Sequence, residues 1–210
     1  VTTAIVVAVA VIMLGAFTRL VDAGLGCPDW PGCYGHVLWP ETGDEIHAAN
    51  QAYPHAPVET DKTWPEMVHR YFASSLGLFT IALAVIAVRN RQAGHPVRLP
   101  VFLLGFIILQ GMFGMWTVTL KLWPQVVTGH LLGGFTTFAL LWLLRLRLSQ
   151  NPWQLSQTGF LWAKTIRPWA IIIFIIVSLQ IALGGWTTSN YAAVACPDLP
   201  TCQDQWLPAM

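Results

Sequence analysis

Two short cysteine loops are the most conspicuous chemical groups in this chain. Residues 27–33 and 196–202 share the pattern Cys-Pro-Asp-x-Pro-x-Cys and together contain all four cysteines, Cys27, Cys33, Cys196 and Cys202. The spacing is compatible with a disulfide in an oxidising compartment, with a redox-active cysteine pair and with a four-cysteine zinc site. The disulfide is favoured, because two prolines suit a small closed loop and structural zinc sites use a closer Cys-x2-4-Cys spacing.

Two histidines, His69 and His130, lie where apolar segments begin. Ionisable residues in such segments are rare and are functional by default. Two imidazoles at one depth on facing helices are what bis-imidazole ligation of a heme iron requires. The small residues that follow them would leave room for a flat macrocycle: Ala73, Ser74, Ser75, Gly133 and Gly134. The alternative is a pair of interfacial histidines that hydrogen-bond to loop backbone.

Three further charged residues lie close to these histidines or at the same boundary. Glu66 precedes His69 by one helical turn and shares its face. It is either a general base or acid near the iron, or the last residue of a capping box, Thr63-Trp64-Pro65-Glu66. Arg19 and Arg70 are candidates for pairing with carboxylates such as heme propionates. Their alternative role is to extend towards the membrane interface.

Five apolar segments must position these residues: 2–19, 67–88, 100–120, 126–146 and 168–188. Each is near the roughly 20 residues that a helix needs to cross a bilayer. Of all residues 55% are hydrophobic and only 10% are charged, and the mean hydropathy is +0.55. The segments lack the alternation of strands, and an open sheet edge cannot face lipid. The sequence therefore predicts an all-α polytopic membrane protein, surrounded by lipid and without a nucleic-acid partner.

The basic residues predict the orientation in the membrane. Seven of the eleven follow the second or the fourth apolar segment: Arg89, Arg91, Arg98, Arg145, Arg147, Lys164 and Arg167. The positive-inside rule places these connections and the N-terminus in the cytoplasm or the mitochondrial matrix. Both cysteine loops then lie outside, and His69 and His130 lie near the outer ends of helices that are diagonal neighbours in an up-down bundle.

The chain contains an internal repeat. Cys27 and Cys196 are 169 positions apart, and the same offset pairs Gly15 with Gly184 upstream of the loops. This predicts a four-helix transmembrane bundle at 1–150, with an outer loop at about 21–64. Residues 151–210 would form the first helix and cysteine loop of an incomplete second bundle, and we expect further helices to follow Met210.

A shorter repeat pairs Leu109-Gln110 with Leu179-Gln180 at an offset of 70. Each pair is followed by a Gly-x-Trp-Thr segment near the end of its helix. Close helix packing with an aromatic belt would explain the pattern. The other interpretation is that these residues shape one end of a buried pocket.

Together these residues resemble the heme A synthases of aerobic bacteria and mitochondria. The resemblance rests on Thr18-Arg19-Leu20, the loop at 24–35, Glu66-x2-His69-Arg70, Gly129-His130 and Cys196-Pro197-Asp198. It implies eight helices in two similar four-helix bundles, each with a histidine pair. It also implies oxidation of the C8 methyl group of heme O to a formyl group, through hydroxylation, which supplies heme A to cytochrome oxidase.

By this resemblance Glu66, His69 and His130 are the carboxylate and the histidine pair of the substrate bundle, and the cysteines are two outer-loop pairs. Heme O is the expected substrate, heme b is expected in the second bundle, and heme O synthase and an electron donor are expected partners. A bacterial or mitochondrial inner membrane is the expected location. Two other functions remain open: a quinone-linked membrane thiol–disulfide oxidoreductase, and a b-type heme-binding assembly factor without catalysis.

Overall fold

The computed structural model describes residues 1–93, 96–149, 156–192, 195–196, 202 and 204–205. Within these residues the chain forms α1 (Thr2–Leu20), α2 (Gly43–Ala52), α3 (Thr60–Arg89), the 3-10 turn η1 (Arg91–Ala93), α4 (Arg98–Thr119), α5 (Pro124–Arg147) and α6 (Gln157–Ser189). Of the six α-helices, all except α2 are long and apolar enough to cross a membrane. Apart from two isolated bridges, the described part of the chain contains no β-structure. The predicted all-α polytopic class is confirmed.

The chain divides into two compact units, and α5 contributes to both. One unit comprises Val1–Leu122 and Gly133–Pro152, and the other comprises Trp123–Leu132 and Trp153–Met210. The division into bundles at 1–150 and 151–210 stays a prediction.

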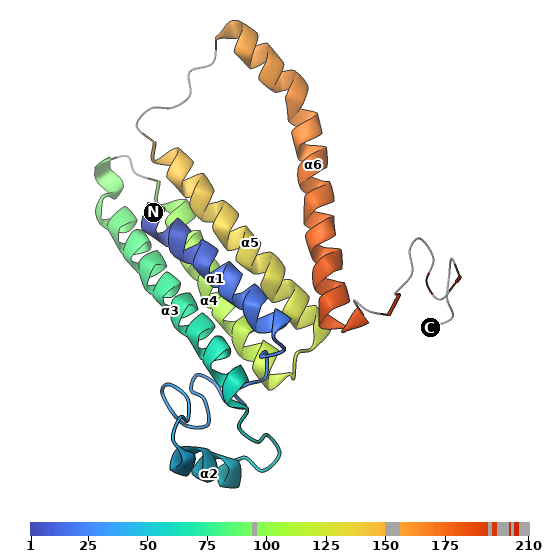
Figure 1. The fold of residues 1–210 in the computed structure, drawn as a ribbon. Coiled ribbons are helices and arrows are strands. Elements are labelled where there is room, and N and C mark those ends of the chain that lie inside the picture. The colour runs from blue at the N-terminus through green and yellow to red at the C-terminus, as the bar shows by residue number, and fades with distance from the viewer. Residues whose placement is uncertain (94–95, 150–155, 193–194, 197–201, 203, 206–210) are drawn as a thin grey trace. The chain divides into compact units, whose positions relative to one another are not determined.

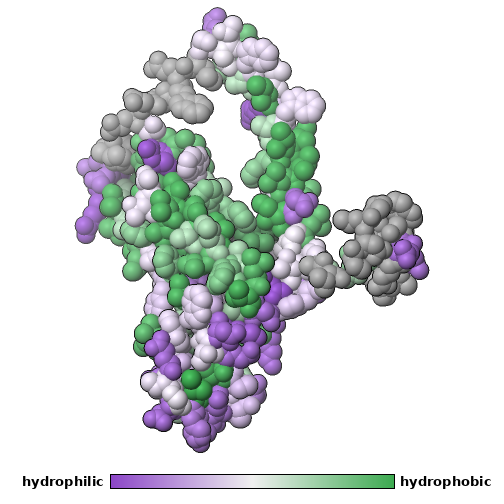
Figure 2. Space-filling model, in the orientation of Figure 1, coloured by the Kyte–Doolittle hydropathy of each residue, from purple (hydrophilic) through white to green (hydrophobic). Residues whose placement is uncertain are grey.

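The core of the first unit lies between α1, α3, α4 and the second half of α5 (Figure 1). Its fully buried centre consists of Ala4, Ile5, Ala8, Leu76, Leu103 and Leu141. Alanines at the contact surface of α1 let its backbone approach the neighbouring helices closely, as in other membrane bundles. Large apolar side chains remain exposed around the helices, whereas hydrophilic residues gather over the segment that contains α2 (Figure 2). This distribution suits a bundle in lipid with one polar end.

The segment between α1 and α3 has a small core of its own. Cys27, Cys33, Tyr34 and Ala49 are buried together with Met67 of α3. Helix α2 begins after a capping box in which the Glu45 backbone N–H donates to the Thr42 hydroxyl (3.3 Å) and the Thr42 backbone N–H donates to the Glu45 carboxylate (3.0 Å). Because Met67 belongs to α3, this second core fixes the segment to the end of the bundle at which α3 begins, called the loop end below.

Two helices begin earlier than the apolar segments predict. Helix α3 begins at Thr60, so that Thr63 and Glu66 both lie inside the helix. Helix α6 begins at Gln157, where the Ser156 hydroxyl accepts a hydrogen bond from the Gly159 backbone N–H. Pro168 therefore lies within α6 and not at its start. Hydropathy marks only the apolar part of a helix, and in α6 the Ser156 cap fixes a start that lies in the polar sequence before it.

Candidate functional site

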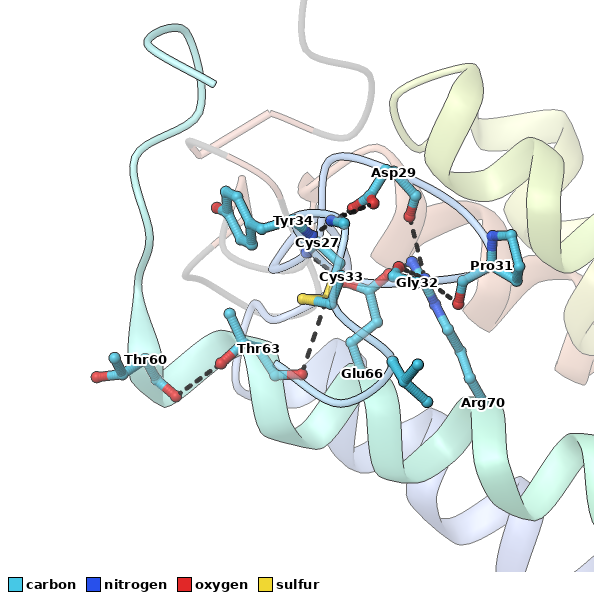
Figure 3. The surroundings of a disulfide bond; sticks show 12 residues. Cys27, Asp29, Pro31, Gly32, Cys33, Tyr34, Thr60, Thr63, Glu66 and Arg70 are labelled. Atoms are coloured by element: carbon cyan, nitrogen blue, oxygen red, sulfur yellow. Dashed lines mark hydrogen bonds and ion pairs between the residues drawn. A yellow bond between two sulfur atoms is a disulfide. The ribbon is translucent and has the colours of Figure 1, made fainter. Parts of the chain in front are cut away.

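The site forms at the loop end of α3, where the first cysteine loop lies against the helix (Figure 3). Cys27 and Cys33 form a disulfide, and both residues are completely buried. In the second unit Cys196 and Cys202 form the matching disulfide. No cysteine in the chain is free, and no cluster of metal-binding side chains occurs among the described residues. The zinc interpretation of the cysteines is therefore wrong.

Glu66 is buried beneath this loop, with 5% of its surface exposed. Its Oε2 atom accepts a hydrogen bond from the Cys27 backbone N–H at 3.1 Å. Its Oε1 atom pairs with Nη2 of Arg70, one turn further along α3. The capping-box interpretation of Glu66 is wrong, because α3 has already begun and the Thr63 hydroxyl donates instead to the Thr60 carbonyl oxygen (3.2 Å). The carboxylate connects the helix to the cysteine loop.

The Arg70 side chain binds the backbone of the same loop. Its Nη1 atom donates to three carbonyl oxygens, those of Asp29 (3.0 Å), Pro31 (3.2 Å) and Gly32 (2.6 Å). The guanidinium thus lies between the Glu66 carboxylate and the loop, as Figure 3 shows. Charge-assisted hydrogen bonds of this kind are stronger than neutral ones. The role predicted for Arg70, contact with a propionate, stays a prediction.

Asp29 stabilises the loop from within. Its carboxylate accepts hydrogen bonds from the backbone N–H groups of Tyr34 (2.6 Å) and Gly35 (2.8 Å). The Tyr34 hydroxyl donates to the Pro57 carbonyl oxygen at 3.2 Å. Burial raises the pKa of the Tyr34 phenol, and the nearby carboxylates of Glu59, Asp29 and Glu66 add to this effect. Sequence patterns alone did not predict this role of Asp29. The signal was that an aspartate occupies the same position in both cysteine loops, at Asp29 and Asp198.

The loop backbone approaches α3 very closely at Gly26. A Cβ atom at this position would overlap the Lys62 carbonyl oxygen, so only glycine fits. Helix α1 is tied to the same turn, because the Thr18 hydroxyl lies 3.3 Å from the Pro65 carbonyl oxygen. Three segments therefore converge where the Glu66 carboxylate is held.

His69 packs against α1. A Cβ atom at Gly15 would lie 2.9 Å from Cε1 of the ring and 3.3 Å from Nδ1, so the glycine makes room for the imidazole. The ring lies beside the Val11 backbone, and its Nδ1 atom is buried without a hydrogen-bond partner among the described residues. A histidine that ligates a metal commonly uses one ring nitrogen for a backbone carbonyl and keeps the other for the metal. The surroundings of His69 fit a role in holding a heme iron.

His130 lies in the part of α5 that belongs to the second unit. There the Thr128 and Ser189 hydroxyls are 3.4 Å apart, and Gly185 makes room for the side chain of Leu131. Since His69 belongs to the first unit, the pairing of the two histidines stays a prediction.

Arg19 lies in the last turn of α1, 3.7 Å from the Asp22 carboxylate. That carboxylate is also 3.7 Å from Nζ of Lys62. The Asp22 side chain is 62% exposed, and such surface pairs contribute little to stability. Contact between Arg19 and a propionate also stays a prediction.

The similarity to known proteins extends over the whole sequence. Residues 1–210 match the model of the COX15-CtaA family, described as cytochrome oxidase assembly protein. The chain is 46% identical over 197 residues to the heme A synthase of Shewanella oneidensis, an alignment that covers 94% of this chain and 58% of that protein. It is 29% identical over 227 residues to the heme A synthase of Rhizorhabdus wittichii (95% and 62%). With the heme A synthase of Halalkalibacterium halodurans it shares 25% identity over 205 residues (96% and 62%). The chain thus spans 58 to 62% of the length of these relatives.

Proposed function

Because this chain belongs to the COX15-CtaA family of cytochrome oxidase assembly proteins, we propose that it carries the heme O site of a heme A synthase. The reaction is the oxidation of the C8 methyl group of heme O to a formyl group. The observation that carries this proposal is the Glu66 carboxylate, buried and held by Arg70 and the Cys27 N–H one turn before His69. A fixed carboxylate beside an imidazole with an unpaired ring nitrogen suits oxidation of a heme substituent.

His69 would hold the iron of heme O, with His130 as the second ligand. The iron supplies the redox chemistry, while the protein binds, orients and excludes water. Glu66 would accept a proton during oxidation of the methyl group. Arg70 and the Cys27 N–H fix the direction of this carboxylate, since each binds a different oxygen atom.

The basic residues after α3 and α5 support an orientation with the cysteine loops outside the cytoplasm or matrix. The heme site would then lie near the outer face of a bacterial or mitochondrial inner membrane. Heme O synthase would supply the substrate, and an electron donor would support the hydroxylation.

The burial of the first disulfide argues against the thiol–disulfide oxidoreductase. Labile, catalytic disulfides are exposed or strained, whereas Cys27 and Cys33 have no exposed surface. The assembly factor without catalysis would use the same histidines, so only a test of chemistry separates it from the synthase.

That test uses cells that make heme O but lack another heme A synthase. Pigments extracted from the purified protein are separated, and the ratio of heme A to heme O is measured. Replacing Glu66 by Gln should leave heme bound and lower the conversion by about 100-fold or more, the usual contribution of a general base. Glu59→Gln is the matched control, because the Glu59 side chain is 56% exposed and its ion pair with Lys62 lies at the surface. Unchanged heme A levels in Glu66→Gln and His69→Ala would refute the proposal.

A further inference from the structure

Gln110 is a buried amide in the apolar interior of the first unit. It lies in α4, nine residues before the end of the helix at Thr119, and 7% of its surface is exposed. Its Oε1 atom is buried and has no hydrogen-bond partner in the described part of the chain. The contact between Gly24 and the Leu122 side chain places this end of α4 at the loop end of the bundle. Along their helices, Gln110 and His69 are therefore equally far from that end, about 14 Å at 1.5 Å per residue.

The neighbouring helix is shaped to admit the amide. A Cβ atom at Gly133 of α5 would overlap the amide atoms of Gln110, so the side chain occupies the space that this glycine leaves. The Thr137 hydroxyl, one turn after Gly133, donates to the Gly133 carbonyl oxygen (2.9 Å) and not to the amide. A membrane interior offers no water to replace a missing partner, and an unpaired buried polar group costs free energy. An amide kept in such a place suits the binding of a polar group on a ligand.

We propose that Gln110 recognises the substrate by a hydrogen bond to its side-chain hydroxyl. This inference rests on the proposed function. Heme O differs from heme b in a long alkyl substituent that bears one hydroxyl group. The propionates of a heme favour the polar interface, so the apolar edge with this substituent would extend into the bundle. A hydroxyl there needs a partner, and the Gln110 amide can both donate and accept. A site that hydrogen-bonds a substrate hydroxyl discriminates against the analogue without it.

The test compares the affinities for two hemes. The purified protein in detergent is titrated separately with heme O and heme b, and binding is followed by absorbance. Gln110→Leu should weaken heme O binding by about tenfold, the loss expected for one buried hydrogen bond. Heme b binding should change by less than about twofold, because heme b lacks the hydroxyl that Gln110 would bind. Gly133→Ala should also reduce the preference for heme O, because its Cβ displaces the amide.

Gln180→Leu is the matched control. Gln180 occupies the position equivalent to Gln110 in the shorter repeat, but it lies on an exposed face of α6, so neither affinity should change. Thermal unfolding of the heme-free protein separates recognition from packing: Gln110→Leu should unfold at the same or a higher temperature, since it removes a buried side-chain oxygen that has no hydrogen-bond partner among the described residues. A lower unfolding temperature with equal losses for both hemes, or undiminished heme O binding, would overturn the inference. If the unaltered protein bound neither heme, the proposed function itself would fail.

Discussion

Replacement of Arg70 by leucine should be among the most destabilising changes in this protein, because it leaves Glu66 buried without its partner. The two side chains are only 13% and 6% exposed. Removal of one member of a buried ion pair typically costs about 3–5 kcal/mol. The hydrogen bonds of Nη1 to Asp29, Pro31 and Gly32 would be lost as well.

A double variant separates these contributions. In Arg70→Leu/Glu66→Leu no charge is left buried, so most of the stability should return, leaving a deficit of about 1–2 kcal/mol for the loop contacts. The coupling energy between the two positions should therefore exceed about 1.5 kcal/mol. Lys62→Leu is the control, because both of its acidic partners are largely exposed, and it should lose far less.

Reversible unfolding in mixed detergent, followed by circular dichroism, measures five proteins: the unaltered protein, Arg70→Leu, the single variant Glu66→Leu that the coupling energy requires, the double variant and Lys62→Leu. A loss below about 1 kcal/mol for Arg70→Leu would show that the carboxylate finds water or another partner. A double variant as unstable as Arg70→Leu would show that the loop contacts, and not the ion pair, dominate. Either result would refute the assignment of Arg70 as the residue that neutralises Glu66.

Three further predictions concern His69, α2 and Tyr34. Gly15→Ala should displace the His69 ring and lower heme affinity by about tenfold or more, as measured by absorbance titration. Gly184→Ala is the control, because Gly184 is the repeat equivalent of Gly15 and a Cβ atom there meets no neighbour within 4 Å. It should leave heme affinity unchanged. The backbone N–H groups of Thr42 and Glu41 lower the pKa of Glu45 below its ordinary 4.5. Its stabilisation of α2 is thus present above pH 4.5 and lost as the pH falls through the lower folded value. Glu45→Ala should therefore increase proteolysis of α2 at pH 7, and this difference should shrink as the pH falls below 4.5. The pKa of Tyr34 is raised by burial above 10.0, so its contribution to stability is complete below pH 10 and declines as the pH rises through the folded value. Tyr34→Phe should remove that decline in unfolding experiments between pH 9 and 11, and an unchanged decline would contradict the burial of the phenol.

Local patterns in the sequence predicted some features well and misplaced others. Apolar length predicted all five membrane helices, because hydrophobicity is a local property of a segment. The pattern Thr-x-x-Glu occurs at both Thr42–Glu45 and Thr63–Glu66, but only the first caps a helix. The Thr-x-x-Glu pattern alone does not distinguish them.

The difference comes from contacts with a distant segment. The Cys27 N–H binds the Glu66 carboxylate across 39 positions of sequence, and Arg70 binds carbonyls about as far away. Spacing placed Glu66 and His69 on one helical face but could not show which groups lie opposite them. The unpaired amide of Gln110 was likewise visible only as part of a repeat, since burial and the absence of a partner depend on how the helices pack.

The burial of the first disulfide has a consequence for biogenesis. Cys27 and Cys33 emerge from the ribosome before Glu66 and Arg70, and their sequence separation of only six positions lets them pair without the rest of the bundle. Once α3 is in place, the loop carbonyls are held by Arg70 and neither sulfur is accessible to another protein. Oxidation therefore has to precede docking of the loop. Assembly of this membrane protein would then depend on an oxidant that acts during insertion, and cysteines that miss it would be closed to later repair.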